Sequence, residues 1–82
     1  MIRARFNVDV DDYRPINWPI KHPYWCTGQS DDVYIIVAYA DDEQEILNNW
    51  PEAENIDAEK AEQYSFTDRF PKPEWLMKEQ KQ

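Results

Sequence analysis

The chain has only one glycine, one cysteine and one histidine among its 82 residues. A single glycine excludes a glycine-rich phosphate-binding loop. A single cysteine excludes an internal disulfide framework, and with one histidine it is too few for a usual four-ligand zinc site. The longest apolar run, residues 33–40, is far shorter than the roughly 20 residues that cross a bilayer. The first residues alternate in polarity and lack a signal peptide's apolar block, so we expect a cytoplasmic protein that does not bind membranes.

Aromatic residues, in contrast, are abundant at 15% of the chain, with four tryptophans, five tyrosines and three phenylalanines. Disordered chains combine high net charge with few aromatic residues, so this content indicates a packed core. A chain of this length has room for one such core. The sequence therefore predicts a single small domain over residues 1–76, followed by a flexible tail over residues 77–82.

The charge is mostly of one sign, with 17 acidic residues against 9 basic ones and a formal net charge of −8. Phosphate contacts need clustered lysine and arginine, so we expect no direct binding of nucleic acid. Residues 41–62 hold nine acids and one base, which equals the whole net charge. This segment is either a solvated surface that keeps a small domain soluble or a docking face for a basic partner.

Three segments have the residue pattern of β-strands. Residues 2–10 alternate apolar and polar side chains, which is typical of a strand with one buried face. Residues 33–39 are almost continuously apolar and rich in β-branched and aromatic residues, which predicts a central strand covered on both faces. Residues 64–70 alternate again and predict a third strand. Residues 11–32 contain three prolines spaced four apart, which indicates an irregular, stiff excursion.

Helix signals follow the apolar strand. Asp41 or Asp42 can cap a helix, with an acidic or amide side chain three residues further on completing a capping box. Ile46 and Trp50 then fall on the side of this helix that faces the core, and Pro51 ends it.

A second short helix is predicted over residues 58–63, with Asp57 as its cap. The fold class is therefore α+β: a small, mostly antiparallel sheet of about three strands, with one or two short helices on one face and a loop rich in proline and tryptophan.

Residues for covalent or metal chemistry are few. Cys26 and His22 lie four apart in a proline-rich loop, without a specified third partner for nucleophilic catalysis. The pairs Asp11-Asp12, Asp31-Asp32 and Asp41-Asp42 could bind a hard cation or act as acid and base, but they flank predicted element ends, where caps and turns favour aspartate. We therefore expect no enzyme activity, no metal and no other cofactor.

Residues 14–25 and 69–75 interleave tryptophan and proline with cationic side chains. Rigid aromatic rings beside arginine can stack a planar base while the cations bind a phosphate. The alternatives are that these tryptophans cover the sheet as part of the core, or that they form an exposed protein-binding patch. The side chains of the hypothetical ligand pocket are Arg3, Arg5, Trp18, His22, Tyr24, Trp25 and Arg69.

Four strings carry a resemblance to a known family. They are Arg-Pro-Ile-Asn-Trp-Pro-Ile-Lys-His-Pro-Tyr-Trp-Cys-Thr-Gly at 14–28, Val-Ala-Tyr-Ala-Asp at 37–41, Asn-Trp-Pro-Glu-Ala at 49–53 and Phe-Thr-Asp-Arg-Phe-Pro-Lys-Pro-Glu-Trp at 66–75. With these, residues 2–75 resemble a family of short proteins encoded by tailed bacteriophages. The family has no assigned function, so the resemblance implies no site residues. It implies a context, because small phage proteins outside the virion and the replication machinery often act on host proteins or host defence.

These observations lead to two hypotheses, both non-covalent. In the first, an acidic face imitates the charges of a DNA backbone, binds a host protein with a basic surface and inhibits host defence or nucleic-acid handling. In the second, the aromatic and arginine pocket sequesters a small anionic ligand of the nucleotide type. Under both hypotheses, we expect the protein to be a monomer or a homodimer. The residues of the predicted acidic face are Asp42, Glu43, Glu45, Glu52, Glu54, Glu59 and Glu62.

Overall fold

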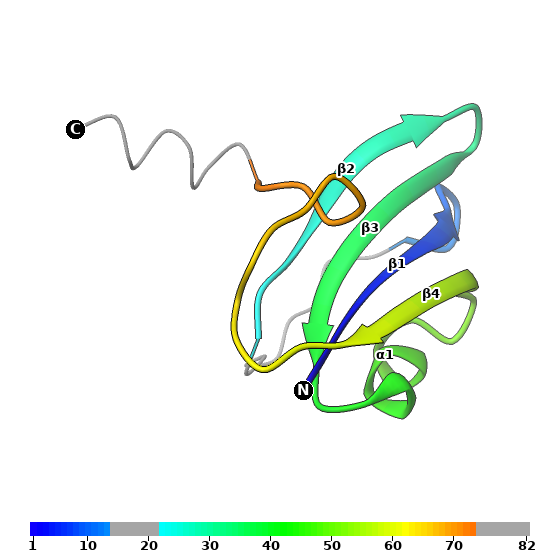
Figure 1. Cartoon of the computed structure of the whole chain (residues 1–82). Coiled ribbons are helices and arrows are strands. Elements are labelled where there is room, and N and C mark those ends of the chain that lie inside the picture. Colours follow the sequence, from blue (N-terminus) through cyan, green and yellow to red (C-terminus); the bar gives the residue numbers. More distant parts are fainter. Residues whose placement is uncertain (14–21, 74–82) are drawn as a thin grey trace.

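The computed structural model describes residues 1–13 and 22–73, which form one antiparallel sheet and one helix (Figure 1). The helix α1 (Glu43–Asn49) lies between the third and fourth strands in the sequence. The order in the sheet is β2-β3-β1-β4. The α+β class is confirmed, although the described residues hold four strands where about three were predicted. The strands are β1 (Ile2–Asp9), β2 (Tyr24–Ser30), β3 (Val33–Ala40) and β4 (Glu54–Lys60).

The inner strand β3 is buried on both of its faces, as its continuous apolar sequence predicts. Ile36 and Ala38 belong to a core cluster on one side of the sheet, here called face A. Val37 and Tyr39 belong to a second cluster on the opposite side, face B. All four are at most 2% exposed. Because side chains alternate along a strand, a strand with two buried faces must be apolar at every position.

The helix α1 covers face A. Ile46 is 1% exposed, and the ring of Trp50 lies 5.2 Å from that of Phe6. The predicted cap is present, since Asp42 Oδ1 accepts the backbone N–H of Glu45 at 2.9 Å. The helix has seven residues, and no helix in the described ranges is long and apolar enough to span a membrane.

Face B is covered by residues 61–73, which contain no helix or strand. The prediction of a strand over 64–70 is therefore wrong. Its backbone instead closes a turn, because the N–H groups of Thr67 and Phe70 each donate to the other's carbonyl at 3.0 and 3.1 Å. Phe66 and Phe70, four residues apart, then both pack on the face B cluster, and Phe70 is fully buried.

The predicted helix over 58–63 is also wrong, because residues 54–60 form the edge strand β4. The helix propensity of this acidic segment is overridden by pairing with β1, a tertiary effect. Ala58 lies opposite Ala4, while Asp57 lies opposite Arg5. The alternation therefore turns Ala58 to face A and places opposite charges beside each other on face B.

A third correction concerns β2, which lies inside the segment expected to be irregular. The last of the three prolines, Pro23, comes just before this strand, and its carbonyl accepts the N–H of Tyr39 at 3.0 Å. Proline is tolerated at the start of a strand, where its missing N–H leaves no ladder bond unmade. Residues 14–21 of the predicted irregular segment, and the predicted tail over 77–82, lie outside the described residues.

The cap of α1 leads to a stability prediction. We expect Asp42→Ala to lower the free energy of unfolding by about 1 kcal/mol, because it removes the acceptor for a first-turn N–H. The matched control Asp42→Asn keeps an acceptor oxygen and is expected to cost much less. Urea unfolding followed by circular dichroism measures both. An equal loss in the two variants would show that the charge, and not the cap, is what stabilises α1.

Tyr13, which packs edge-on against Tyr34 at 5.2 Å, leads to a pH prediction. Partial burial, together with nearby Tyr24, Cys26 and Tyr34, raises the pKa of Tyr13 above its ordinary value of 10.0. Folding thus favours the protonated phenol, so its contribution to stability is complete below pH 10 and is lost as the pH rises through the raised value. In alkaline denaturation series, Tyr13→Phe should lose less stability above pH 10 than the unmodified protein.

Candidate functional site

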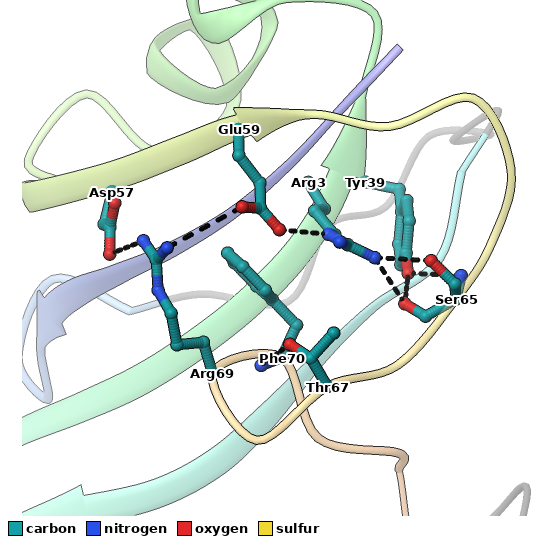
Figure 2. A network of polar contacts seen from close by, with 8 residues as sticks. All are labelled: Arg3, Tyr39, Asp57, Glu59, Ser65, Thr67, Arg69 and Phe70. Atoms are coloured by element: carbon teal, nitrogen blue, oxygen red, sulfur yellow. Dashed lines mark hydrogen bonds and ion pairs between the residues drawn. The ribbon is translucent and has the colours of Figure 1, made fainter.

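Arg3 is the centre of a polar network on face B (Figure 2). Its Nε donates to Glu59 Oε1 at 2.6 Å, across the β1–β4 pair. Its Nη1 donates to the carbonyl oxygen of Ser65 at 3.0 Å and also to the hydroxyl of Ser65. The hydrogen bond to Glu59 raises the pKa of the Arg3 guanidinium above its ordinary value. Arg3 therefore ties the sheet to the covering segment.

Tyr39 holds the same point of that segment from the inner strand. Its hydroxyl donates to the carbonyl of Ser65 and accepts the Ser65 N–H at 2.9 Å. The Tyr39 side chain is itself part of the buried cluster of face B. The backbone of Ser65 is consequently fixed by two side chains from two neighbouring strands.

Arg69 completes the network from the covering segment. It pairs with Asp57 and lies 3.7 Å from Glu59, and the bond to Asp57 raises the pKa of Arg69. The guanidinium carbons of Arg3 and Arg69 each lie 5.2 Å from the centre of the Phe70 ring. The buried phenylalanine is thus held between two cations, which are in turn bound by two carboxylates of β4 (Figure 2).

The structure does not bring the predicted ligand pocket together as one group. Trp25 is 7% exposed and packs on face B with Phe66, whereas Tyr24 contacts Trp50 on face A. Arg3 and Arg69 direct their donors at the protein's own carboxylates. Arg5 is exposed on face B. Trp18 lies outside the described residues.

His22 has partners that its sequence spacing does not predict. Its Nε2 lies 3.0 Å from Asp41 Oδ1, and its Nδ1 lies 2.8 Å from the hydroxyl of Tyr64. Cys26 instead donates its thiol to the carbonyl of Gly28 at 3.2 Å. His22 and Cys26 therefore do not form the dyad considered from the sequence. A carboxylate, an imidazole and a phenol are connected in its place.

The seven carboxylates of the predicted acidic face lie in several places. Three stand at the start of α1, near the end of β3, and Glu62 follows the end of β4. Glu52 and Glu54 lie at the opposite end of the sheet, where β4 begins and β1 ends. Glu59 is engaged with Arg3 and Arg69. The seven carboxylates predicted within residues 41–62 therefore do not form one continuous face.

A different acidic group forms where β1 ends. Asp9 lies opposite Val33, and the Val10 N–H donates to the Asp32 carbonyl at 2.7 Å, so the β2–β3 turn lies beside the end of β1. Glu54 lies opposite Asn7 on the other side of β1. Strand pairing thus gathers acids that are distant in sequence. This acidic pole consists of Asp9, Asp11, Asp12, Asp31, Asp32, Glu52 and Glu54.

Part of the acidic pole surrounds a pocket of about 260 Å³. An irregularity in the β1–β4 pairing between Arg5 and Asn7 gives β4 an extra residue there, and Asn55 adopts a left-handed backbone with φ of 55°. Such bulges bend a strand and redirect its side chains. In the described ranges, no three His, Cys, Asp or Glu side chains are placed so that together they could hold a metal ion. The pocket is lined by Asn7, Asp9, Asp12, Val33, Glu52, Glu54 and Asn55.

The sequence contained the acidic pole only as separate pairs. Asp11-Asp12 and Asp31-Asp32 each resemble ordinary turn residues, and the structure does place Asp31 in a left-handed turn with φ of 52°. Their proximity depends on which strands pair. If the register of β1 against β3 had been known, it would have predicted that these two pairs lie at the same end of the sheet.

Comparisons with protein-family models, with curated proteins and with solved structures found no match to this chain.

The network around Arg3 leads to a second stability prediction. Arg3→Lys should lower the urea midpoint, because an ammonium cannot reproduce the planar fork that bonds Glu59 and Ser65 while lying over Phe70. Arg5→Lys, on the same strand and face but exposed, is the matched control and should change the midpoint much less. Equal shifts in both variants would mean that the network contributes nothing beyond its charge.

Proposed function

We propose that the protein acts by binding a basic protein partner, non-covalently, through the acidic pole. The observation that carries this proposal is that strand pairing gathers seven acidic residues from three chain segments at one end of the sheet, where four of them line a concave pocket. Among the described residues, the pocket lining contains four carboxylates and no lysine or arginine. It has room for a cationic head group, and its two asparagines can hydrogen-bond to one.

Electrostatics support this choice of partner. A concave surface lined by charges of one sign concentrates the field and speeds the capture of an oppositely charged partner. Such complementarity also selects among partners, because a like-charged surface is repelled. The formal net charge of −8 adds a long-range attraction toward any basic surface.

The partner class follows from the same chemistry. Duplex DNA carries one negative charge per roughly 1.7 Å of its axis, and proteins that bind it present clustered lysine and arginine. A dense group of carboxylates competes for such a surface. We therefore infer that the partner handles nucleic acid and that occupancy of its basic surface inhibits it. In the context that the phage resemblance implies, this is a host protein of defence or nucleic-acid metabolism.

The geometry favours this proposal over sequestration of an anionic ligand. To reach Arg3 or Arg69, an anion would have to displace Glu59 and Asp57, which already bind them. It would also have to separate Phe70 from both guanidiniums.

The experiment compares two triple variants that change net charge equally at opposite ends of the sheet. The pole variant carries Asp9→Asn, Glu52→Gln and Glu54→Gln, and the control carries Asp42→Asn, Glu43→Gln and Glu45→Gln. Tagged proteins are incubated with host extract at low salt, and retained proteins are quantified by mass spectrometry. We expect a basic, nucleic-acid-binding protein to be retained by the native chain and the control but lost from the pole variant.

Two further measurements test the mechanism with the purified partner. The logarithm of the affinity should fall linearly with the logarithm of salt concentration, and duplex DNA should displace the protein. If both triple variants lose the partner equally, net charge alone is responsible and the pole is not the site. Binding that is indifferent to salt would also overturn the proposal.

A further inference from the structure

Asp41, His22 and Tyr64 form a hydrogen-bonded chain at the end of the sheet opposite the acidic pole. They come from three segments: the residue after β3, a residue just before β2, and the segment that follows β4. The two contacts measure 3.0 Å from Asp41 Oδ1 to His22 Nε2 and 2.8 Å from His22 Nδ1 to Tyr64 Oη. A nucleophile bonded to a base, with the base oriented by a third group, is the arrangement that activates hydroxyl nucleophiles.

When the imidazole is neutral, the protons in the two hydrogen bonds of this relay can be placed in only one way. An ionised carboxylate only accepts hydrogen bonds, so His22 Nε2 carries the hydrogen that it donates to Asp41. His22 Nδ1 is then the acceptor, and the Tyr64 hydroxyl donates to it. The phenol proton therefore already points at the base that would remove it.

Tyr64 is accessible and yet held in place. It is the only large hydrophobic residue in the described ranges that is exposed, at 51%. Its ring packs edge-on against Tyr39 at 4.9 Å and against His22 at 5.9 Å. The next residue, Ser65, is fixed by Arg3 and Tyr39. The exposed Tyr64 is thus held at its hydroxyl by His22 and at its ring by Tyr39.

We propose that Tyr64 is a nucleophilic modification site that accepts an acyl group from a neutral activated ester. In this step the Tyr64 oxygen attacks the ester carbonyl carbon and forms a new carbon–oxygen bond. The phenol proton passes to His22 Nδ1, and Asp41 stabilises the resulting imidazolium. The bond to the leaving group then breaks, the leaving group takes the proton from His22, and an ester of Tyr64 remains.

The class of donor follows from the charges around the relay. Asp41 is part of it, and Asp42 and Glu45 lie at the adjoining start of α1, where Glu45 accepts the Asp41 N–H at 2.8 Å. These carboxylates repel anionic donors such as phosphoryl groups and leave neutral acyl donors as the suitable class. Because the relay and the acidic pole occupy opposite ends of the sheet, this proposal stands independently of the proposed partner binding.

The experiment uses p-nitrophenyl acetate as the probe, on the full chain carrying Cys26→Ser so that the exposed thiol does not react. Labelling is followed by intact mass and located by peptide mapping, with Tyr13 and Tyr34 as internal references. We expect the mass of one acetyl group at Tyr64, formed much faster than at either reference. His22→Asn should slow labelling at Tyr64 about 100-fold, the usual contribution of a general base.

Two variants separate chemistry from folding. Tyr64→Phe keeps the ring packing and should abolish the fast label, and Asp41→Asn keeps an acceptor for Nε2 but removes the charge, which should slow it. Circular dichroism confirms that each variant is folded. Labelling of Tyr64 at the same rate in the His22→Asn variant, or no faster than at Tyr13 and Tyr34, would overturn the proposal.

Discussion

The sheet has two apolar faces but, among the described residues, only one helix to cover them, and most of the structure follows from this constraint. Face A is closed by α1, which is capped at its start by the Asp42 side chain and closed at its end by the bond from the Trp50 N–H to the Ile46 carbonyl. Face B must be closed by residues 61–73, which have no regular structure. A covering segment of this kind needs side chains to fix it, because buried polar backbone groups without partners are costly.

The fixing side chains decide where the remaining charge lies. Arg3 and Arg69 hold Phe70 between them and bind Asp57 and Glu59 of β4, so these cations and acids neutralise one another on face B. Of the other acidic residues that the structure describes, all but Asp68 of the covering segment lie toward the two ends of the sheet. The pairing on face B therefore leaves most of the negative charge of the described residues toward the two ends of the sheet.

Features set by neighbouring residues could be predicted from the sequence, whereas features set by pairing could not. The alternation in β1, the apolar run of β3 and the Asp42 cap are local patterns, and the structure contains all three. A helix was predicted over residues 58–63 because these residues favour one in isolation, and only the pairing of β4 with β1 shows that residues 58–60 belong to a strand. The acidic pole and the partners of His22 depend in the same way on contacts between residues distant in the sequence.

The two ends of the sheet therefore differ in kind, although both are acidic. At the end of β1, four carboxylates line the pocket to which we assign partner binding. At the other end, a carboxylate is used to orient His22 toward an exposed phenol. β1, with eight residues at about 3.3 Å each, separates the two ends. At physiological salt this separation exceeds the Debye length of about 8 Å, so charge changes at one end are largely screened from the other. We therefore expect that mutation can remove the proposed partner binding and the proposed tyrosine modification separately.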